Sequence, residues 1–140
     1  MIVLIMNILT KKTIAEIERN ILTKLQTAGA DIVSDLSLDS TRAVGDAVQT
    51  YVQSIFHDCI PAGFLKKVED GSSRRSMEDF AFYDKKDNYY AVDVKTHNIG
   101  TDFNMPNLIS VKRLASFYRN NTNYFCILMI GYKIRDGKIN

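Results

Sequence analysis

The chain has 140 residues, 46% of them hydrophobic and 24% charged, which is the balance of an ordinary soluble domain with a substantial core. The formal net charge of +2 is only mildly basic, so a nucleic-acid partner must be argued from local clusters of charge and not from the total. The apolar residues 1–6 are too few to span a bilayer and carry no signal-peptide pattern, which predicts a cytoplasmic protein without a membrane partner.

Two amphipathic helices are predicted first. A capping-box pattern at residues 13–16 begins the first helix, and Gly29 ends it after an apolar stripe at helical spacing. Asp39 or Ser40 caps the second helix, whose apolar face extends to Cys59 before Pro61 stops it. Residues 1–38 are therefore assigned to an N-terminal helical region, and residues 39–140 to the core of the same single domain.

Strand patterns dominate the second half of the chain. Residues 64–69, 78–83 and 89–98 read as strands, and the polar turn at residues 84–88 joins the last two into a hairpin. Pro106 suits the first turn of a helix over residues 107–119, and the apolar run 124–130 fits a central buried strand. The predicted inner face of that helix comprises Leu108, Val111, Leu114, Ala115 and Tyr118. A strand, a helix and a further strand imply a crossover, so we predict an α/β fold with an αβββαβ core and a mixed central sheet.

The third of these strands carries an acid and a base among apolar residues. Asp93 and Lys95 are two residues apart, so their side chains point to the same face of the strand, where charges need partners. At the rise of a strand their Cα atoms are about 6.6 Å apart, which lets both side chains reach one bound phosphate. This arrangement is typical of a site that cleaves phosphodiesters.

A second acid reaches the same place if the hairpin has a three-residue loop. With residues 85–87 as the loop, Asp84 pairs with Asn88, and Asp79 lies opposite Asp93 on the same face, with Cβ atoms about 5 Å apart. A loop one residue longer or shorter moves Asp79 to the other face. Two facing carboxylates repel each other unless a proton or a cation lies between them, and such hard oxygen ligands suit Mg²⁺.

These residues resemble the PD-(D/E)xK motif of type II restriction endonucleases. Asp79 matches the first acid, Asp93 the second and Lys95 the lysine, while Glu78 stands where the motif usually has proline. The run 93–99, continued by residues 106–110 and 112–115, is similar to the corresponding segment of HincII and its relatives. The resemblance covers residues 79–140 well and residues 42–57 weakly, and it implies a restriction-endonuclease-like core, with 39–140 as the catalytic part.

The resemblance implies a Mg²⁺-dependent endodeoxyribonuclease of the restriction-modification kind, which hydrolyses double-stranded DNA as a homodimer and leaves 5′-phosphate ends. Asp79, Asp93 and the Val94 carbonyl are expected to hold Mg²⁺, while Lys95 orients the attacking water and steadies the transition state. Glu78 and Asp46 are possible supporting acids. Glu78 competes with Asp79 for the place facing the metal, and a carboxylate at the position of Asp46, near a helix N-terminus, is also favoured by the helix dipole alone.

Contacts with DNA phosphates are expected from two basic pairs and from two polar residues that follow the lysine. Each basic pair alone is compatible with a solvated surface, and the polar residues either bind phosphates or cap a loop. The expected DNA-binding residues are Arg74, Arg75, Thr96, Asn98, Lys112 and Arg113.

Two other functions fit the same residues: a structure-specific repair or recombination nuclease with this core, and a non-catalytic DNA-binding module on it. The Asp-Gly turn at residues 136–137 starts a returning strand just before the last residue. We therefore expect a C-terminus that is truncated relative to restriction enzymes of this kind.

Overall fold

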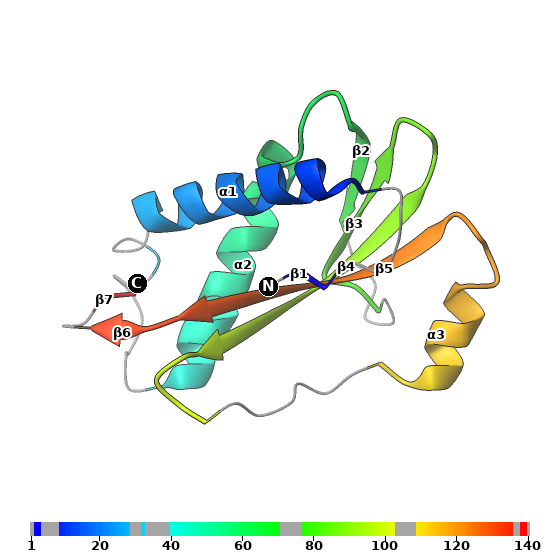
Figure 1. The fold of residues 1–140 in the computed structure, drawn as a ribbon. Coiled ribbons are helices and arrows are strands. Elements are labelled where there is room, and N and C mark those ends of the chain that lie inside the picture. The colour runs from blue at the N-terminus through cyan, green and yellow to red at the C-terminus, as the bar shows by residue number, and fades with distance from the viewer. Residues whose placement is uncertain are drawn as a thin grey trace.

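The computed structural model describes residues 2–3, 9–28, 32, 40–70, 77–102, 109–135 and 138–139. Over these ranges the fold is α/β, with a five-stranded mixed sheet in the order β1-β5-β4-β3-β2 and a separate β6-β7 pair. Figure 1 shows α1 and α2 packed together, while α3 lies apart from them near the end of the sheet where β5 begins. The elements are β1 (Ile2–Val3), α1 (Lys11–Ala28), α2 (Thr41–Cys59), β2 (Leu65–Asp70), β3 (Phe80–Asp84), β4 (Tyr89–Asn98), α3 (Val111–Phe117), β5 (Asn123–Tyr132), β6 (Ile134–Arg135) and β7 (Lys138–Ile139).

The two predicted N-terminal helices are present, with one correction at a helix start. α1 begins at Lys11, before the predicted capping box, because the Thr10 hydroxyl accepts a hydrogen bond from the Thr13 N–H at 3.1 Å. α2 begins after Ser40, whose side chain accepts from the Ala43 N–H at 3.2 Å, and this confirms one of the two predicted caps.

α2 supplies the helical side of the core. Val44, Val48 and Val52 recur at helical spacing and are almost completely buried, as are the sheet residues Tyr90 and Val94. Tyr90, Val92 and Val94 alternate along β4, so they share the face that packs on α2. Asp93 and Lys95 therefore belong to the opposite face of β4.

The β3–β4 hairpin has the predicted register. Strand pairing runs from Phe80 against Val92 to Tyr83 against Tyr89, and the Asp84 N–H donates to the Asn88 carbonyl at 3.1 Å. The loop consists of residues 85–87 and ends on Asp87, whose φ of 64° is left-handed, as three-residue hairpin loops require. The loop length that aligns the two acids is thus confirmed.

β5 joins β4 as a parallel neighbour, which confirms the mixed sheet. The pairing extends from Tyr89 against Asn123 to Asn98 against Tyr132, so β5 is longer than the predicted run 124–130. β5 is buried on alternate residues, because one face packs on the α1–α2 layer and the other is only half-covered. β1 pairs antiparallel with the other edge of β5, a strand that the sequence pattern did not predict.

The third helix is shorter than predicted, and its inner face is different. α3 begins only at Val111, because the Ser110 side chain caps it by accepting from the Arg113 N–H, and residues 103–108 lie outside the described part. Val111 was predicted to face inward but is 84% exposed, and Ala115 and Tyr118 are exposed as well. Phe117 makes the inward contact instead, against Tyr89 and Phe125.

Two predictions concern regions near the limits of the described residues. The Asp-Gly turn at 136–137 lies outside them, but the strands on either side pair as in a hairpin, Ile134 with Ile139 and Arg135 with Lys138. Among the helices that the structure describes, none is both long and apolar enough to cross a membrane.

Candidate active site

Asp79 immediately precedes β3, at the point where β4 extends beyond its pairing with β3. Its N–H donates to the Val92 carbonyl at 2.9 Å, whereas a regular ladder would turn this N–H away from β4. The chain therefore deviates in the manner of a β-bulge just before Phe80. The deviation brings the Asp79 carboxylate to the edge of β4, where its Oδ2 accepts from the Val94 N–H at 2.6 Å. The Asp79 carboxylate thus accepts the hydrogen bond that a backbone carbonyl of a longer β3 would accept in a regular ladder. The sequence predicted instead that Asp79 lies on the face of the sheet, opposite Asp93.

A residue of α2 holds the other oxygen of this carboxylate. Gln49 Nε2 donates to Asp79 Oδ1 at 2.7 Å, so donors from a helix and from a strand meet on one acid. Gln49 is not among the site residues predicted from the sequence. In the sequence, Gln49 is marked only as a polar residue on a helix beside the apolar positions Val48 and Val52, which are buried. That pattern does not indicate a hydrogen-bond partner 30 residues away.

Asp93 and Lys95 form an ion pair on the open face of β4. Lys95 Nζ lies 2.9 Å from Asp93 Oδ1, and the side chains are 29% and 12% exposed respectively. Burial raises the pKa of Asp93 above its ordinary value, Lys95 opposes this shift, and the neighbouring Asp79 carboxylate adds to it. The predicted trio of Asp79, Asp93 and Lys95 is therefore close together, and its two acids repel each other.

The oxygen atoms near this edge are of the type that a hard cation prefers as ligands. In a strand the N–H and C=O of one residue point to the same side, so the Val94 carbonyl is directed toward the edge where Asp79 binds the Val94 N–H. The part of the chain that the structure describes has no group of three or more His, Cys, Asp or Glu side chains placed to hold a metal. Mg²⁺ needs only one or two carboxylates, because it keeps several of its waters. Asp79, Asp93 and the Val94 carbonyl thus form a chemically suitable donor set.

Glu78 points to a different partner from Asp79. The Tyr89 hydroxyl donates to Glu78 Oε1 at 2.9 Å, and burial together with this bond raises the pKa of Tyr89. Of the two neighbouring acids, it is Asp79 that contacts β4 beside Lys95. Glu78 instead lines a hollow with Arg113 and Phe117 at the start of β4.

Three further predicted residues gather at the other end of β4. Asp46 of α2, Thr96 and Asn98 line one polar hollow of about 310 Å³. The helix approaches the strand closely here, since a Cβ on Gly45 would lie 2.7 Å from the Thr96 hydroxyl oxygen. The Asp46 side chain is 72% exposed, and its carboxylate lies 4.0 Å from Arg42. This indicates a solvated charge on the helix more than a third acid acting together with Asp79 and Asp93.

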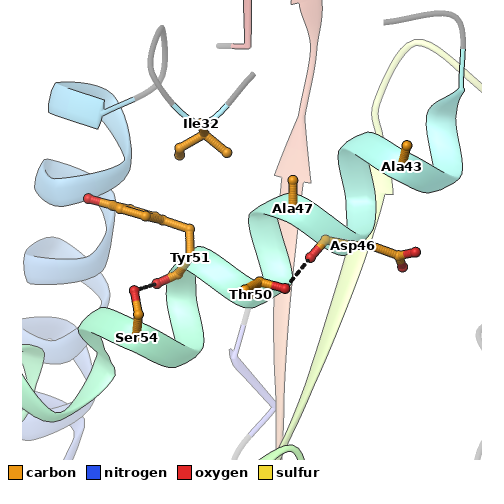
Figure 2. A pocket seen from close by; sticks show the side chains of 7 residues that line it. All are labelled: Ile32, Ala43, Asp46, Ala47, Thr50, Tyr51 and Ser54. Atoms are coloured by element: carbon orange, nitrogen blue, oxygen red, sulfur yellow. Dashed lines mark hydrogen bonds between the residues drawn. The ribbon is translucent and has the colours of Figure 1, made fainter. Parts of the chain in front are cut away.

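The hollow drawn in Figure 2 lies on another side of α2. Ala43, Ala47 and Tyr51 line it together with Ile32, and the figure shows the Asp46 carboxylate directed away from Ile32. Its three hydroxyls all have partners: Thr50 donates to the Asp46 carbonyl at 2.8 Å, Ser54 to the Tyr51 carbonyl at 2.6 Å, and Tyr51 to the Lys24 carbonyl at 3.4 Å. This hollow therefore presents mainly carbon surface.

The basic residues predicted to bind DNA are only partly described. The basic pair of α3, Lys112 and Arg113, is exposed, and α3 is anchored near Tyr89, at the opposite end of β4 from Thr96. Arg74 and Arg75 lie outside the described residues. The structure thus unites Asp79, Asp93 and Lys95, and places Thr96 and Asn98 toward one end of β4 and Lys112 and Arg113 near the other.

Comparison with known protein families and with curated proteins gives no match to this chain.

Proposed function

We propose that this protein is a Mg²⁺-dependent endodeoxyribonuclease with a restriction-endonuclease-like core. The observation that carries the proposal is that Asp79, bound at the edge of β4, lies close to Asp93 and Lys95 on its open face. Two acids and one lysine in a partly exposed site are the groups needed to hold a cation and to stabilise a pentacovalent phosphate. The proposed donor set is Asp79, Asp93 and the Val94 carbonyl, with Mg²⁺ supplying Lewis acidity and a more acidic bound water.

Each side chain of the trio has a definite task in this proposal. Asp79 is held by donors on both oxygens, so it presents its remaining lone pairs in a fixed direction. Asp93 bears a charge that is unfavourable in its buried position, and a cation relieves this cost. In the absence of substrate, Lys95 forms an ion pair with Asp93. In the proposed reaction its ammonium moves toward the phosphate as negative charge develops there.

The proposed partner is double-stranded DNA, bound by a homodimer in which each copy cuts one strand. The polar hollow with Thr96 and Asn98 and the basic pair of α3 lie toward the two ends of β4, with the acidic pair between them. Thr96 faces α2, on the same side of β4 as Val92 and Val94, so it is not on the open face that carries Asp93 and Lys95. On that open face a DNA backbone would meet the basic pair of α3 on one side of the scissile phosphate. This arrangement supports DNA over a small phosphodiester as the substrate.

The direct test is cleavage of plasmid, linear and branched DNA in Mg²⁺, with Ca²⁺ as a comparison. We expect discrete fragments in Mg²⁺, and a loss of kcat of about 10²–10³-fold for Lys95→Ala with DNA affinity nearly unchanged. Lys85→Ala is the matched control, because Lys85 lies exposed in the hairpin loop. Preference for branched DNA would indicate a structure-specific nuclease, and binding without cleavage by the intact chain would indicate a non-catalytic module and refute the proposal.

A further inference from the structure

Gln49 is placed with little freedom. Its neighbours Val48 and Val52 are 1% and 0% exposed, so the turn of α2 that carries Gln49 is locked into the core. The close approach of Gly45 to Thr96, one turn earlier, holds the same helix against β4. A side chain on such a rigid element can fix a partner more closely than one on a loop.

The partner of Gln49 is a carboxylate that has a second donor from another element. Gln49 Nε2 binds Asp79 Oδ1 at 2.7 Å, and the Val94 N–H binds Asp79 Oδ2 at 2.6 Å. Two donors on two different oxygens fix both the position and the plane of the carboxylate. Each oxygen still keeps acceptor capacity, since an ionised carboxylate has about four lone-pair sites.

We propose that Gln49 is a positioning residue, which acts through Asp79 and holds this acid in the orientation that cation binding and cleavage require. The inference rests on the proposed function of the Asp79–Asp93–Lys95 site. The chemical type at residue 49 matters as well as its shape. A methionine would leave Asp79 Oδ1 without this donor, and a glutamate would add a third negative charge beside two acids that already repel each other.

The first measurement needs neither metal nor DNA. Amide hydrogen exchange at Val94 reports its bond to Asp79, and we expect exchange about tenfold faster in Gln49→Met and in Gln49→Glu than in the wild type. Gln53→Met is the matched control, because Gln53 lies one turn further along α2 and is half-buried like Gln49. It should exchange at Val94 as the wild type does.

The second measurement is steady-state DNA cleavage in Mg²⁺. Gln49→Met should lower kcat about 10- to 100-fold, as is usual when the partner of a metal ligand is removed. KM for DNA should stay the same, because the contact of Gln49 is with Asp79 and not with the substrate surface. Gln53→Met should leave both constants unchanged.

The outcomes separate this inference from the proposed function. Unchanged Val94 exchange in Gln49→Met would overturn the positioning role, even if the wild type cleaves DNA. Wild-type behaviour of the isosteric Gln49→Glu would also overturn it, since residue 49 would then only fill space. If Val94 exchange responds as expected but the wild type cleaves no DNA, the positioning of Asp79 stands and the nuclease proposal fails.

Discussion

Asp84 is the acid on which the hairpin depends most, although it is not part of the candidate site. It is 2% exposed and lies at the end of β3. Its carboxylate accepts four hydrogen bonds, from the Lys86 N–H at 2.8 Å, the Asn88 N–H at 3.0 Å, Asn88 Nδ2 at 2.9 Å and the Tyr90 hydroxyl at 3.0 Å. These bonds hold the three-residue loop and hence the register that brings Asp79 to β4.

Replacing Asp84 with Ala leaves buried donors without an acceptor. The Lys86 N–H lies in an exposed turn and can bind water, but Asn88 and the Tyr90 hydroxyl are buried. An unsatisfied buried donor costs about 1–3 kcal/mol, so three of them are expected to lower the free energy of unfolding by about 3–9 kcal/mol. This is a large part of the total of about 5–15 kcal/mol that a typical domain has.

The loss should depend on pH in a definite direction. Burial by itself would raise the pKa of Asp84, but the hydrogen bonds from Asn88, Lys86 and Tyr90 outweigh it and lower the pKa below its ordinary value. A lowered pKa in the folded state means that the stabilisation is complete at neutral pH. It disappears as the pH falls below about 4 and through the folded pKa.

Urea unfolding of the wild type, Asp84→Ala and the exposed control Lys85→Ala, at pH 7 and again below pH 4, measures both effects. The difference between wild type and Asp84→Ala should be large at pH 7 and smaller at the acid pH, while Lys85→Ala stays close to wild type. A difference below about 1 kcal/mol at pH 7, or one that does not change with pH, would refute this account of the network.

Three further predictions concern the site and its surroundings. Gly45→Ala should lower the free energy of unfolding, measured in urea, by about 1–3 kcal/mol, because the new Cβ meets the Thr96 hydroxyl. Adding Thr96→Ala should restore most of the loss, and a double variant as unstable as the single one would contradict this. In thermal unfolding, Mg²⁺ at ten times its dissociation constant should stabilise the wild type and Glu78→Gln by about 1.4 kcal/mol but leave Asp79→Asn almost unchanged. If Mg²⁺ instead stabilises Asp79→Asn and not Glu78→Gln, then Glu78 is the ligand. Replacing the basic pair of α3 with Ala should reduce the salt slope of DNA binding by about one to two, and an unchanged slope would remove α3 from the interface.

Much of the fold and the main cluster could be predicted from the sequence, because the relevant signals are local. Hairpin loop length fixes strand register, and the polar turn at residues 85–87 between two apolar strands was enough to align Asp79 with the segment of Asp93 and Lys95. The apolar stripe of α2 and its Ser40 cap were likewise contained within one stretch of chain. The sequence has three Asp-x-Lys triplets, at residues 84–86, 93–95 and 136–138, and the surrounding apolar pattern separated 93–95, which lies within β4, from the two in polar turn segments.

Only the tertiary structure decided what surrounds these residues. The hydrogen bond from Gln49 to Asp79 joins positions 30 apart in the chain, and no local pattern indicates it, since any half-buried glutamine on a helix has the same appearance in sequence. The bulge-like turn at Asp79 moves its carboxylate from the sheet face to the strand edge, and periodicity assumes a regular ladder. The predicted inner face of α3 was wrong for a related reason. That face depends on Ser110, which caps the start of the helix, and on the contacts of Phe117 with Tyr89 and Phe125, which are set by packing between elements.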